Sequence, residues 1–313
     1  PMVGCVIVNE GKIIAEGWHK KAGKNHAERE AILKVKDRSL LLDSTLYVNL
    51  EPCDHHGKTP PCTNIIIENK IPRVVIGCLD QNKKVLGEGH RKLEENGCKV
   101  TFGILESECQ KLNRRFFTFH QKKRPYVILK WAESTDGFIA PKQPYMDFWL
   151  TNSLSKQRVH QWRSQEQSIM IGVHTALIDN PQLSTRLWTG NNPLPIIIDP
   201  HQKFTKSVRD LKLKKDKFLS IKNRKFKKND RQFLISAKDI LNQLYERDLQ
   251  SVIVEGGAKT LQHFIDADLF DEARIFRSNE KLNGGLLAPK IDIDIKSFSS
   301  KIKKDKLLTI YRN

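Results

Sequence analysis

The sequence has no run of consecutive apolar residues that approaches the length of about eighteen needed for a membrane-spanning helix. Its second half has no cysteine, since all six cysteines lie between Cys5 and Cys109. No secretory segment precedes them, so the paired disulfides of a secreted protein are not expected. We therefore expect a soluble, cytoplasmic protein with reduced thiols and no membrane partner.

Acidic residues are scarce relative to basic ones, because 36 Asp and Glu stand against 54 Lys and Arg and give a formal net charge of +18. The densest basic segment, Lys203 to Lys228, contains only three aromatic residues, Phe204, Phe218 and Phe226. Nucleic-acid binders usually combine such charge with aromatic side chains on which bases stack. A solvated basic surface that attracts a phosphorylated small molecule is the favoured interpretation, and no nucleic-acid partner is expected.

The second half also lacks a Gly-x-Gly-x-x-Gly motif, which argues against the dinucleotide-binding turn of a Rossmann domain. Another phosphate cradle is available in Glu255-Gly256-Gly257-Ala258-Lys259-Thr260, which follows the apolar run Val252-Ile253-Val254. Its backbone amides and an expected helix N-terminus could face a pyrophosphate. Without further context, a simple tight turn is an equally good interpretation of the Gly-Gly pair.

The length of 313 residues is enough for two domains, each with its own core. Gln121-Lys122-Lys123-Arg124-Pro125 is a short charged segment that ends in proline, which is typical of a link between domains. We therefore predict one domain over residues 1–120 and a second over residues 125–313.

Hydrophobic periodicity predicts alternating strands and helices on both sides of this link. In the first half we expect strands over residues 3–8, 12–18, 45–50, 73–78 and 98–102, and helices over residues 26–36, 62–69, 87–96 and 106–119. In the second half we expect strands over residues 126–132, 168–172, 195–199, 217–221, 251–255 and 272–276, and helices over residues 152–164, 237–247 and 258–267. Alternation of this kind indicates a layered α/β fold for each domain.

The most specific motif is His26-Ala27-Glu28, followed by Pro52-Cys53 and then by Cys62. One imidazole and two thiolates supply three zinc ligands and leave a fourth position for water, as a catalytic zinc site requires. Glu28 follows the histidine ligand by two residues, where nucleobase deaminases place the glutamate that carries protons. The motif predicts hydrolytic deamination, with Glu28 as a catalytic residue and His26, Cys53 and Cys62 as the metal ligands.

A structural zinc site is the main alternative for these residues. Such a site needs a fourth ligand, which His55, His56 or Cys5 could provide, and it would leave Glu28 without a task. A second alternative involves no metal, since cysteines of a reduced protein are often buried as small apolar side chains.

The spacing of the two cysteines limits which families of zinc deaminase the sequence can resemble. Eight residues separate Cys53 from Cys62, whereas nucleic-acid deaminases usually contain Pro-Cys-x-x-Cys. This insertion, with Gly17-Trp18-His19 and the run from Tyr47 to Cys53, resembles the deaminase half of the bifunctional riboflavin-biosynthesis deaminase/reductase family. The resemblance implies a cytidine-deaminase-like three-layer domain with one zinc ion. It also implies a further helix before the position of Pro1, which we expect to be missing from this chain. The implied substrate contacts in this half are His19, His55, Lys58 and Thr59.

The second half resembles the reductase domain of the same family. The resemblance rests on the run from Leu129 to Gly137, on Ile171-Gly172 with Thr175 and Asp179-Asn180-Pro181, and on Val254-Glu255-Gly256-Gly257. It implies a dihydrofolate-reductase-like fold that binds NADPH. The implied cofactor contacts are Ala132, Trp149, Thr175, Asp179, Gly257, Ala258, Lys259 and Thr260. The implied substrate contacts are Arg163, Leu183, Arg186 and Glu255.

Two kinds of basic side chain in this half suit a phosphorylated sugar. The guanidinium forks of Arg163 and Arg186 can bind the phosphoribosyl end through paired hydrogen bonds. Lys130 is the candidate catalytic residue, placed to polarise the reacting sugar. A lysine that only extends its stem along the strand is the alternative for Lys130.

Together the two resemblances imply consecutive steps of riboflavin synthesis. The first is zinc-dependent hydrolytic deamination of 2,5-diamino-6-ribosylamino-4(3H)-pyrimidinone 5′-phosphate, and the second is reduction of the ribosyl group to ribityl by NADPH, in a homo-oligomer. The competing hypothesis is a zinc deaminase that acts on RNA and uses the basic second half as a binding module. The long insertion and the few aromatic residues count against it. A degenerate partner subunit that binds zinc without turnover is a third, non-enzymatic hypothesis.

Overall fold

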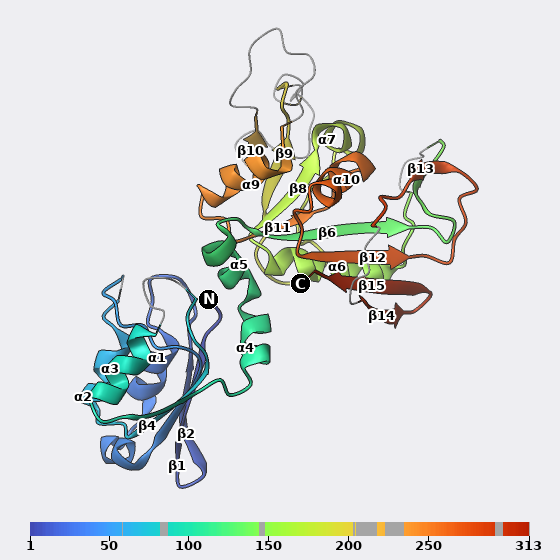
Figure 1. Ribbon diagram of the computed structural model, residues 1–313. Coiled ribbons are helices and arrows are strands. Elements are labelled where there is room, and N and C mark those ends of the chain that lie inside the picture. Colours follow the sequence, from blue (N-terminus) through green and yellow to red (C-terminus); the bar gives the residue numbers. More distant parts are fainter. Residues whose placement is uncertain are drawn as a thin grey trace. The chain divides into compact units, whose positions relative to one another are not determined.

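The computed structural model describes residues 1–57, 59–81, 87–143, 148–202, 204, 218–222, 235–291 and 297–312. The chain divides into two compact units, unit 1 (Pro1–Lys122) and unit 2 (Lys123–Asn313) (Figure 1). The charged segment 121–125 lies across this division. No helix in the described ranges is long and apolar enough to cross a membrane.

Unit 1 is built on a five-stranded sheet with the order β2-β1-β3-β4-β5. Its strands are β1 (Gly4–Asn9), β2 (Lys12–Trp18), β3 (Thr45–Leu50), β4 (Arg73–Cys78) and β5 (Lys99–Phe102). β1 pairs antiparallel with β2 and β3, whereas β3, β4 and β5 run parallel. Because parallel strands end at the same edge of a sheet, the segments that follow β3 and β4 begin close together.

Helices cover both faces of this sheet, which gives unit 1 three layers. On one side lie α1 (Ala27–Lys34), α2 (Cys62–Glu68) and α3 (Glu88–Glu95), and on the other lies α4 (Glu106–Leu112) (Figure 1). The helix α1 contacts β2 so closely that a side chain at Gly17 would lie 2.4 Å from the carbonyl oxygen of Ala27. On the opposite face, a side chain at Gly77 would lie 2.3 Å from the Sγ of Cys109 in α4. The short 3-10 helix η1 (Arg38–Asp43) precedes β3.

The prediction of one helix over residues 106–119 is wrong, because two helices occupy this region, α4 and α5 (Arg114–Lys122). The break falls at Asn113, whose side chain pairs with the backbone of Met2. Its Oδ1 accepts a hydrogen bond from the Met2 N–H at 2.7 Å, and its Nδ2 donates one to the Met2 carbonyl at 3.0 Å. The periodicity of the sequence does not reveal this break, since the partner is 111 residues away.

Unit 2 contains an eight-stranded sheet with the order β10-β9-β8-β11-β6-β12-β15-β14. The strands are β6 (Tyr126–Glu133), β8 (Ser168–Gly172), β9 (Leu194–Ile198), β10 (Leu219–Ile221), β11 (Ser251–Val254), β12 (Glu272–Arg277), β14 (Ser297–Ile302) and β15 (Asp305–Tyr311). The strands from β10 to β12 run parallel, and β15 and β14 complete the sheet antiparallel.

Side chains of unit 2 alternate between two cores, one on each face of the sheet. Val127 and Leu129 of β6 pack in one core with α9 (Ala237–Tyr245) and α10 (Ala258–Asp266). Their neighbour Ile128 packs in the other core with α6 (Ser153–Gln165) and α7 (Val173–Asp179). The layered α/β architecture predicted from the sequence is confirmed in both units.

Several elements of unit 2 are absent from the sequence prediction. They are α7, the paired strands β7 (Phe138–Pro141) and β13 (Gly285–Leu287), and the hairpin of β14 and β15. β14 is exposed along most of its length and shows no apolar alternation. Its hydrogen bonds to β15 hold it in the sheet.

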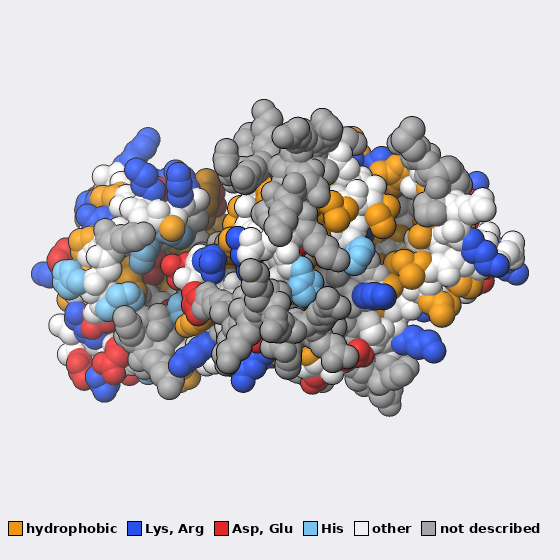
Figure 2. All heavy atoms as spheres, turned by 90° about the horizontal axis from the view of Figure 1, so that it is seen from above, with side chains coloured by type: hydrophobic (Ala, Val, Ile, Leu, Met, Phe, Trp, Pro, Cys, Tyr) orange, Lys and Arg blue, Asp and Glu red, His pale blue; other side chains and the backbone are white. Residues whose placement is uncertain are grey.

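Most of the basic segment Lys203 to Lys228 lies outside the described residues. On the face shown in Figure 2, the described lysine and arginine side chains are interspersed with acidic, histidine and apolar ones. That view therefore shows no continuous basic surface among the residues that the structure describes.

Candidate functional site

The three predicted metal ligands come from separate elements of unit 1 and meet at one point. His26 immediately precedes α1, Cys53 lies in the loop after β3, and Cys62 is the first residue of α2. The Nδ1 atom of His26 lies 3.4 Å from the Sγ of Cys53 and 3.4 Å from the Sγ of Cys62. All three donor atoms lie within 4.8 Å of one another, which fits a zinc ion with bonds of about 2.0–2.3 Å.

This cluster has three metal-ligating side chains and no fourth among the described residues. His55 and His56 are exposed, and Cys5 is buried in the core beside the sheet. Three ligands leave one coordination position for water, so the geometry favours a catalytic zinc site over a structural one.

Glu28 lies in the first turn of α1 and is only 3% exposed. Burial raises the pKa of its carboxyl group to about 7, and the Cys53 thiolate adds to this effect. Its Oε2 atom has no hydrogen-bond partner among the described residues. A buried oxygen without a partner is unfavourable, so its retention points to a bound group that it contacts. A carboxyl group with a pKa near 7 can both accept and deliver a proton at neutral pH.

The polar groups around the donors prepare them to bind a cation. Hydrogen bonds from the Cys62 thiol and from His26 lower the pKa of Cys53 to about 4, so Cys53 carries a thiolate at neutral pH. The pKa of Cys62 is raised, because it donates its proton to that thiolate. The hydroxyl of Thr59 lies 3.4 Å from the Nε2 atom of His26, and this contact orients the ring with Nδ1 toward the thiols.

A cavity of about 270 Å³ opens beside the donors. It is lined by His19, Ala22, Gly23, His26, Cys53, His55, Gly57 and Thr59. His19 donates through Nδ1 to the Asn25 carbonyl at 3.0 Å in one tautomer, and its ring meets the ring of His26 edge-on with 5.2 Å between centroids. The predicted substrate contacts His19, His55 and Thr59 therefore line the same cavity as the ligands, while Lys58 lies outside the described residues.

In unit 2, Glu255 directly follows β11, and it lies beside Lys130 of the adjacent parallel strand β6, where the pairing of the two strands ends. The Nζ atom of Lys130 lies 3.4 Å from Oε2 of Glu255, and both side chains are largely buried. Burial raises the pKa of Glu255, but the charges of Arg163 and Lys130 outweigh it and hold the pKa at about 2. Burial lowers the pKa of Lys130, and Glu255 opposes this shift.

Arg163 extends from α6 and uses its guanidinium fork on Glu255. Its Nε and Nη2 atoms donate to the two carboxylate oxygens at 2.9 and 2.8 Å, and its Nη1 atom donates to the Ser184 carbonyl at 3.0 Å. In this structure the paired hydrogen bonds of Arg163 thus go to a carboxylate, whereas the sequence suggested a phosphate. Arg186 is exposed as a whole residue. The pKa of its guanidinium is lowered, first by partial burial and then by the nearby charge of Arg163. The side chain of Leu183 is 3% exposed and packs in the core.

The predicted cofactor residues of α7 and α10 lie together. The Gly257 N–H donates to the Thr175 hydroxyl at 3.0 Å. A side chain at Gly172 would lie 2.6 Å from the Thr260 hydroxyl, and one at Gly256 would lie 3.0 Å from the Cβ of Thr260. The helix α10 begins at Ala258 directly after this turn, so the N–H groups of its first turn, including that of Lys259, suit a pyrophosphate.

The other predicted cofactor residues lie on separate elements. Ala132 is in β6, Asp179 is the last residue of α7, and Trp149 precedes α6. Trp149 is 55% exposed, with the Nζ atom of Lys156 3.6 Å from the centre of its ring. Burial raises the pKa of Asp179. Their contacts with a cofactor stay a prediction.

His160 is a candidate functional residue of unit 2 that was not predicted from the sequence. It is 2% exposed, and its Nδ1 atom has no hydrogen-bond partner in the described part of the chain. Burial, then the charges of Arg163 and Arg186, lower its pKa to about 4, so it is neutral at pH 7. The feature of the sequence that could have indicated His160 is its position one helical turn before Arg163.

Two family models match the chain. The model of the cytidine and deoxycytidylate deaminase zinc-binding region matches residues 1–78, and that of the RibD C-terminal domain matches residues 125–291. The riboflavin biosynthesis protein RibD of Aquifex aeolicus is 36% identical, over 98% of this chain and 88% of that protein. RibD of Escherichia coli K12 is 31% identical, over 88% of this chain and 81% of that protein.

Solved structures give the same result. A diaminohydroxyphosphoribosylaminopyrimidine deaminase/5-amino-6-(5-phosphoribosylamino)uracil reductase from Thermotoga maritima is 36% identical, with a TM-score of 0.85, over 99% of this chain and 91% of that one. RibD of Acinetobacter baumannii is 27% identical, with a TM-score of 0.84 and the same coverage. Residues 125–291 match a domain of riboflavin-biosynthesis proteins, so their interpretation as an RNA-binding module is not supported.

Proposed function

The chain belongs to the RibD family of bifunctional riboflavin-biosynthesis enzymes, with a deaminase and a reductase domain, and we propose the substrate and the residues for each step. Unit 1 removes an amino group from 2,5-diamino-6-ribosylamino-4(3H)-pyrimidinone 5′-phosphate by hydrolysis. Unit 2 then reduces the ribosyl group of the product to ribityl with NADPH. The gathering of His26, Cys53 and Cys62 beside the Oε2 atom of Glu28, which has no partner among the described residues, carries the first half of the proposal.

His26, Cys53 and Cys62 would hold the zinc ion of the deaminase. When bound, zinc makes water a nucleophile near neutral pH. Glu28 accepts a proton from the attacking water at its Oε2 atom and delivers it to the leaving amine, so that ammonia departs and a carbonyl group replaces the amino group. Its pKa of about 7 suits both transfers.

The cavity beside these donors receives the pyrimidine ring. His19 and His55 line it and offer ring nitrogens to the polar edge of the substrate, while Thr59 also orients His26. Lys58 belongs to the same loop, and we propose that it binds the phosphate or a carbonyl group of the substrate.

In unit 2, Glu255 directly follows the carboxyl end of β11, where α/β sheets usually bind ligands, and Lys130 of the adjacent parallel strand β6 lies beside it. When bound, NADPH would supply a hydride to C1′ of the ribosyl group, while the bond from C1′ to the ring oxygen breaks and that oxygen takes up a proton, which gives ribityl. Lys130 polarises the sugar at that carbon, and Glu255 holds Lys130 in place and contacts the substrate. Arg163 fixes Glu255 through its paired hydrogen bonds, Arg186 binds the phosphate end, and Leu183 contributes to the wall of the site.

Residues of α7 and of the start of α10 would hold the cofactor. Gly257, Ala258, Lys259 and Thr260 would bind its pyrophosphate at the helix N-terminus. Thr175 supports this turn through its bond to Gly257. The remaining contacts that we propose are Ala132, Trp149 and Asp179.

To test this proposal, the diaminopyrimidinone ribosylamino phosphate is added to zinc-loaded protein. Ammonia release is measured first, and NADPH oxidation is measured second. The Glu28→Gln variant should lose ammonia release by a factor of about 10²–10⁴ and still oxidise NADPH when deaminated product is supplied. Absence of both activities in the unaltered protein would refute the substrate assignment. Ammonia release without NADPH oxidation on the product would refute the role proposed for unit 2.

Two further properties belong to the same proposal. We expect a cytoplasmic location, because Cys53 and Cys62 must stay reduced to bind zinc and the described cysteines form no disulfide. We also expect a homo-oligomer, which the molar mass in solution would test.

A further inference from the structure

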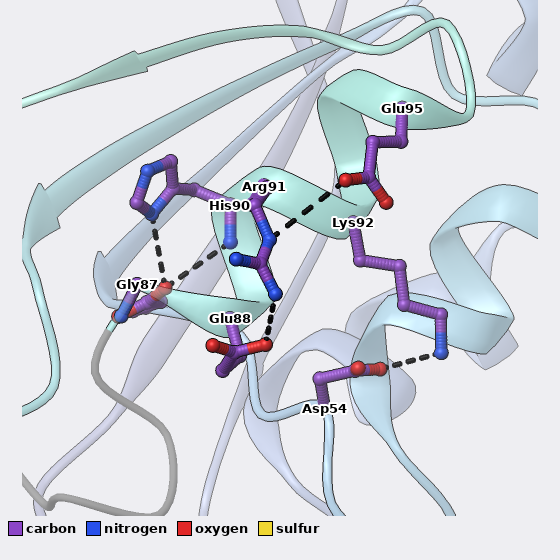
Figure 3. A network of polar contacts seen from close by, with 8 residues as sticks. Asp54, Gly87, Glu88, His90, Arg91, Lys92 and Glu95 are labelled. Atoms are coloured by element: carbon purple, nitrogen blue, oxygen red, sulfur yellow. Dashed lines mark hydrogen bonds and ion pairs between the residues drawn. The ribbon is translucent and has the colours of Figure 1, made fainter.

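The two segments that carry the thiolate ligands are tied to each other and to α3 by side chains that do not bind the metal. Asp54, next to Cys53, accepts hydrogen bonds at Oδ1 from the Thr63 hydroxyl and from Lys92 Nζ, both at 2.5 Å. Lys92 also donates to the Oδ1 atom of Asn64 at 2.9 Å. One ammonium group in α3 therefore bridges the residue after Cys53 and a residue two positions after Cys62. Figure 3 shows the contact of Lys92 with Asp54.

The backbone adds a second tie between the same segments. The Thr63 N–H donates to the Cys53 carbonyl at 3.3 Å. Thr63 is completely buried, and the side chains of Asp54 and Lys92 are only 21% and 33% exposed. Because water reaches this cluster only in part, its charge-assisted bonds hold geometry better than a fully exposed pair would.

The start of α3 also holds the chain on the other side of Cys53. The buried carboxylate of Glu51 accepts hydrogen bonds from the backbone N–H groups of Asp80, Gly87 and His90 at 3.1 to 3.2 Å, and it contacts His90 Nδ1 at 3.2 Å. A side chain at Gly89 would lie 2.0 Å from the Pro52 carbonyl oxygen, so the helix rests directly on the backbone before Cys53.

The remaining ion pairs of α3 differ from this arrangement. Among the residues that the structure describes, Arg91 forms ion pairs within its own helix alone, with Glu88 and with Glu95, and all three side chains are more than half exposed. Figure 3 shows these pairs on α3, separate from the contact of Lys92 with Asp54. Arg91 is therefore a natural control for Lys92, with a similar length and the same charge one residue away.

We propose that Lys92, through Asp54 and Asn64, positions the thiolates of Cys53 and Cys62 for the metal. This inference rests on the proposed zinc deaminase site. Lys92 touches neither substrate nor metal in this role, so it is a positioning residue. When it is removed, the two hydrogen bonds of Thr63 still connect the cysteine segments, but their thiolates are held less firmly in the geometry that zinc requires.

A purely electrostatic role predicts the opposite effect. Loss of the Lys92 charge leaves the Asp54 carboxylate, next to a ligand, without its cationic partner, and this extra negative charge attracts a divalent cation more strongly. Positioning predicts weaker zinc binding, whereas charge alone predicts tighter binding. The sign of the change therefore separates the two explanations.

The experiment measures the zinc dissociation constant of the full chain by competition with a chromophoric chelator. The Lys92→Met variant should bind zinc about 10- to 100-fold more weakly than the unaltered protein, and the Arg91→Met variant should not differ from it. Lys92→Arg should restore part of the affinity, because a longer cation still reaches Asp54. With cobalt(II) as the probe, Lys92→Met should also change the visible absorption bands, which depend on the angles between the ligands.

A second variant guards against a folding defect. Asn64→Ala removes only one arm of the bridge and should weaken zinc binding in the same direction by a smaller factor. Equal or tighter zinc binding by Lys92→Met relative to Arg91→Met would overturn the inference and leave the proposed function standing. An unaltered protein that binds no zinc would overturn both.

Discussion

Neutralisation of Glu255 should remove a pH-dependent part of the stability of unit 2. Arg163 and Lys130 surround this buried carboxylate and, against the effect of burial, hold its pKa at about 2, compared with an ordinary value of 4.5. A difference of about 2.5 pKa units corresponds to about 3 kcal/mol of stability. Because the folded pKa is the lower one, this contribution is complete well above pH 4.5 and is lost as the pH falls toward 2.

The linkage relation with these two pKa values predicts a loss of about 2 kcal/mol between pH 7 and pH 3. Glu255→Gln removes the titrating group and should abolish this part of the pH dependence. It should also lower stability at pH 7 by about 3 kcal/mol or more, because Arg163 and Lys130 stay buried without their partner.

Urea unfolding followed by tryptophan fluorescence measures this difference, since every tryptophan except Trp18 lies in unit 2. The free energies of unfolding of the two proteins should converge as the pH falls from 7 to 3. A difference that stayed constant over this range would refute the reasoning, because it would show that Glu255 does not titrate as the geometry requires.

Three further predictions concern packing, metal and catalysis. Gly17→Ala should destabilise unit 1 by about 1–3 kcal/mol in urea unfolding, because the new methyl group would lie 2.4 Å from the Ala27 carbonyl, whereas Gly4→Ala, with nothing within 4 Å, should have little effect. Removal of zinc by a chelator should lower the melting temperature of unit 1 and leave that of unit 2 unchanged. If the free zinc concentration was 100-fold above the dissociation constant, the free energy of unfolding of unit 1 should fall by about 2.7 kcal/mol. Arg163→Lys should reduce kcat/KM of NADPH oxidation by about 10- to 100-fold with ammonia release unaltered, because lysine cannot make both hydrogen bonds to Glu255.

The metal site could be predicted from the sequence because its signal lies in residue type and spacing. A histidine, a glutamate two positions later and two cysteines at helix or loop starts are rarely found together without a metal. The structure then places His26, Cys53 and Cys62 around one point and leaves an oxygen of Glu28 without a partner among the described residues. The alternation of strands and helices was equally accessible, since the apolar residues of each element repeat with its own period.

Other features depend on partners that are distant in the chain, and no local pattern encodes them. The predicted helix is interrupted at Asn113, whose side chain pairs with Met2, 111 residues earlier. The guanidinium fork of Arg163 binds Glu255, 92 residues later, instead of remaining open for a phosphate.

The sequence by itself thus determined the family and the candidate zinc ligands of this protein, because a histidine, a glutamate and two cysteines are recognisable by residue type and spacing. Only the tertiary structure decided which charges neutralise one another and which helix supports the metal loop. Lys92 illustrates the distinction. In the sequence it resembles its neighbour Arg91, but in the structure it contacts Asp54, which lies 38 residues earlier in the chain. Such contacts arise when parallel strands end at one edge and bring separate loops together, and this proximity exists only in the folded chain.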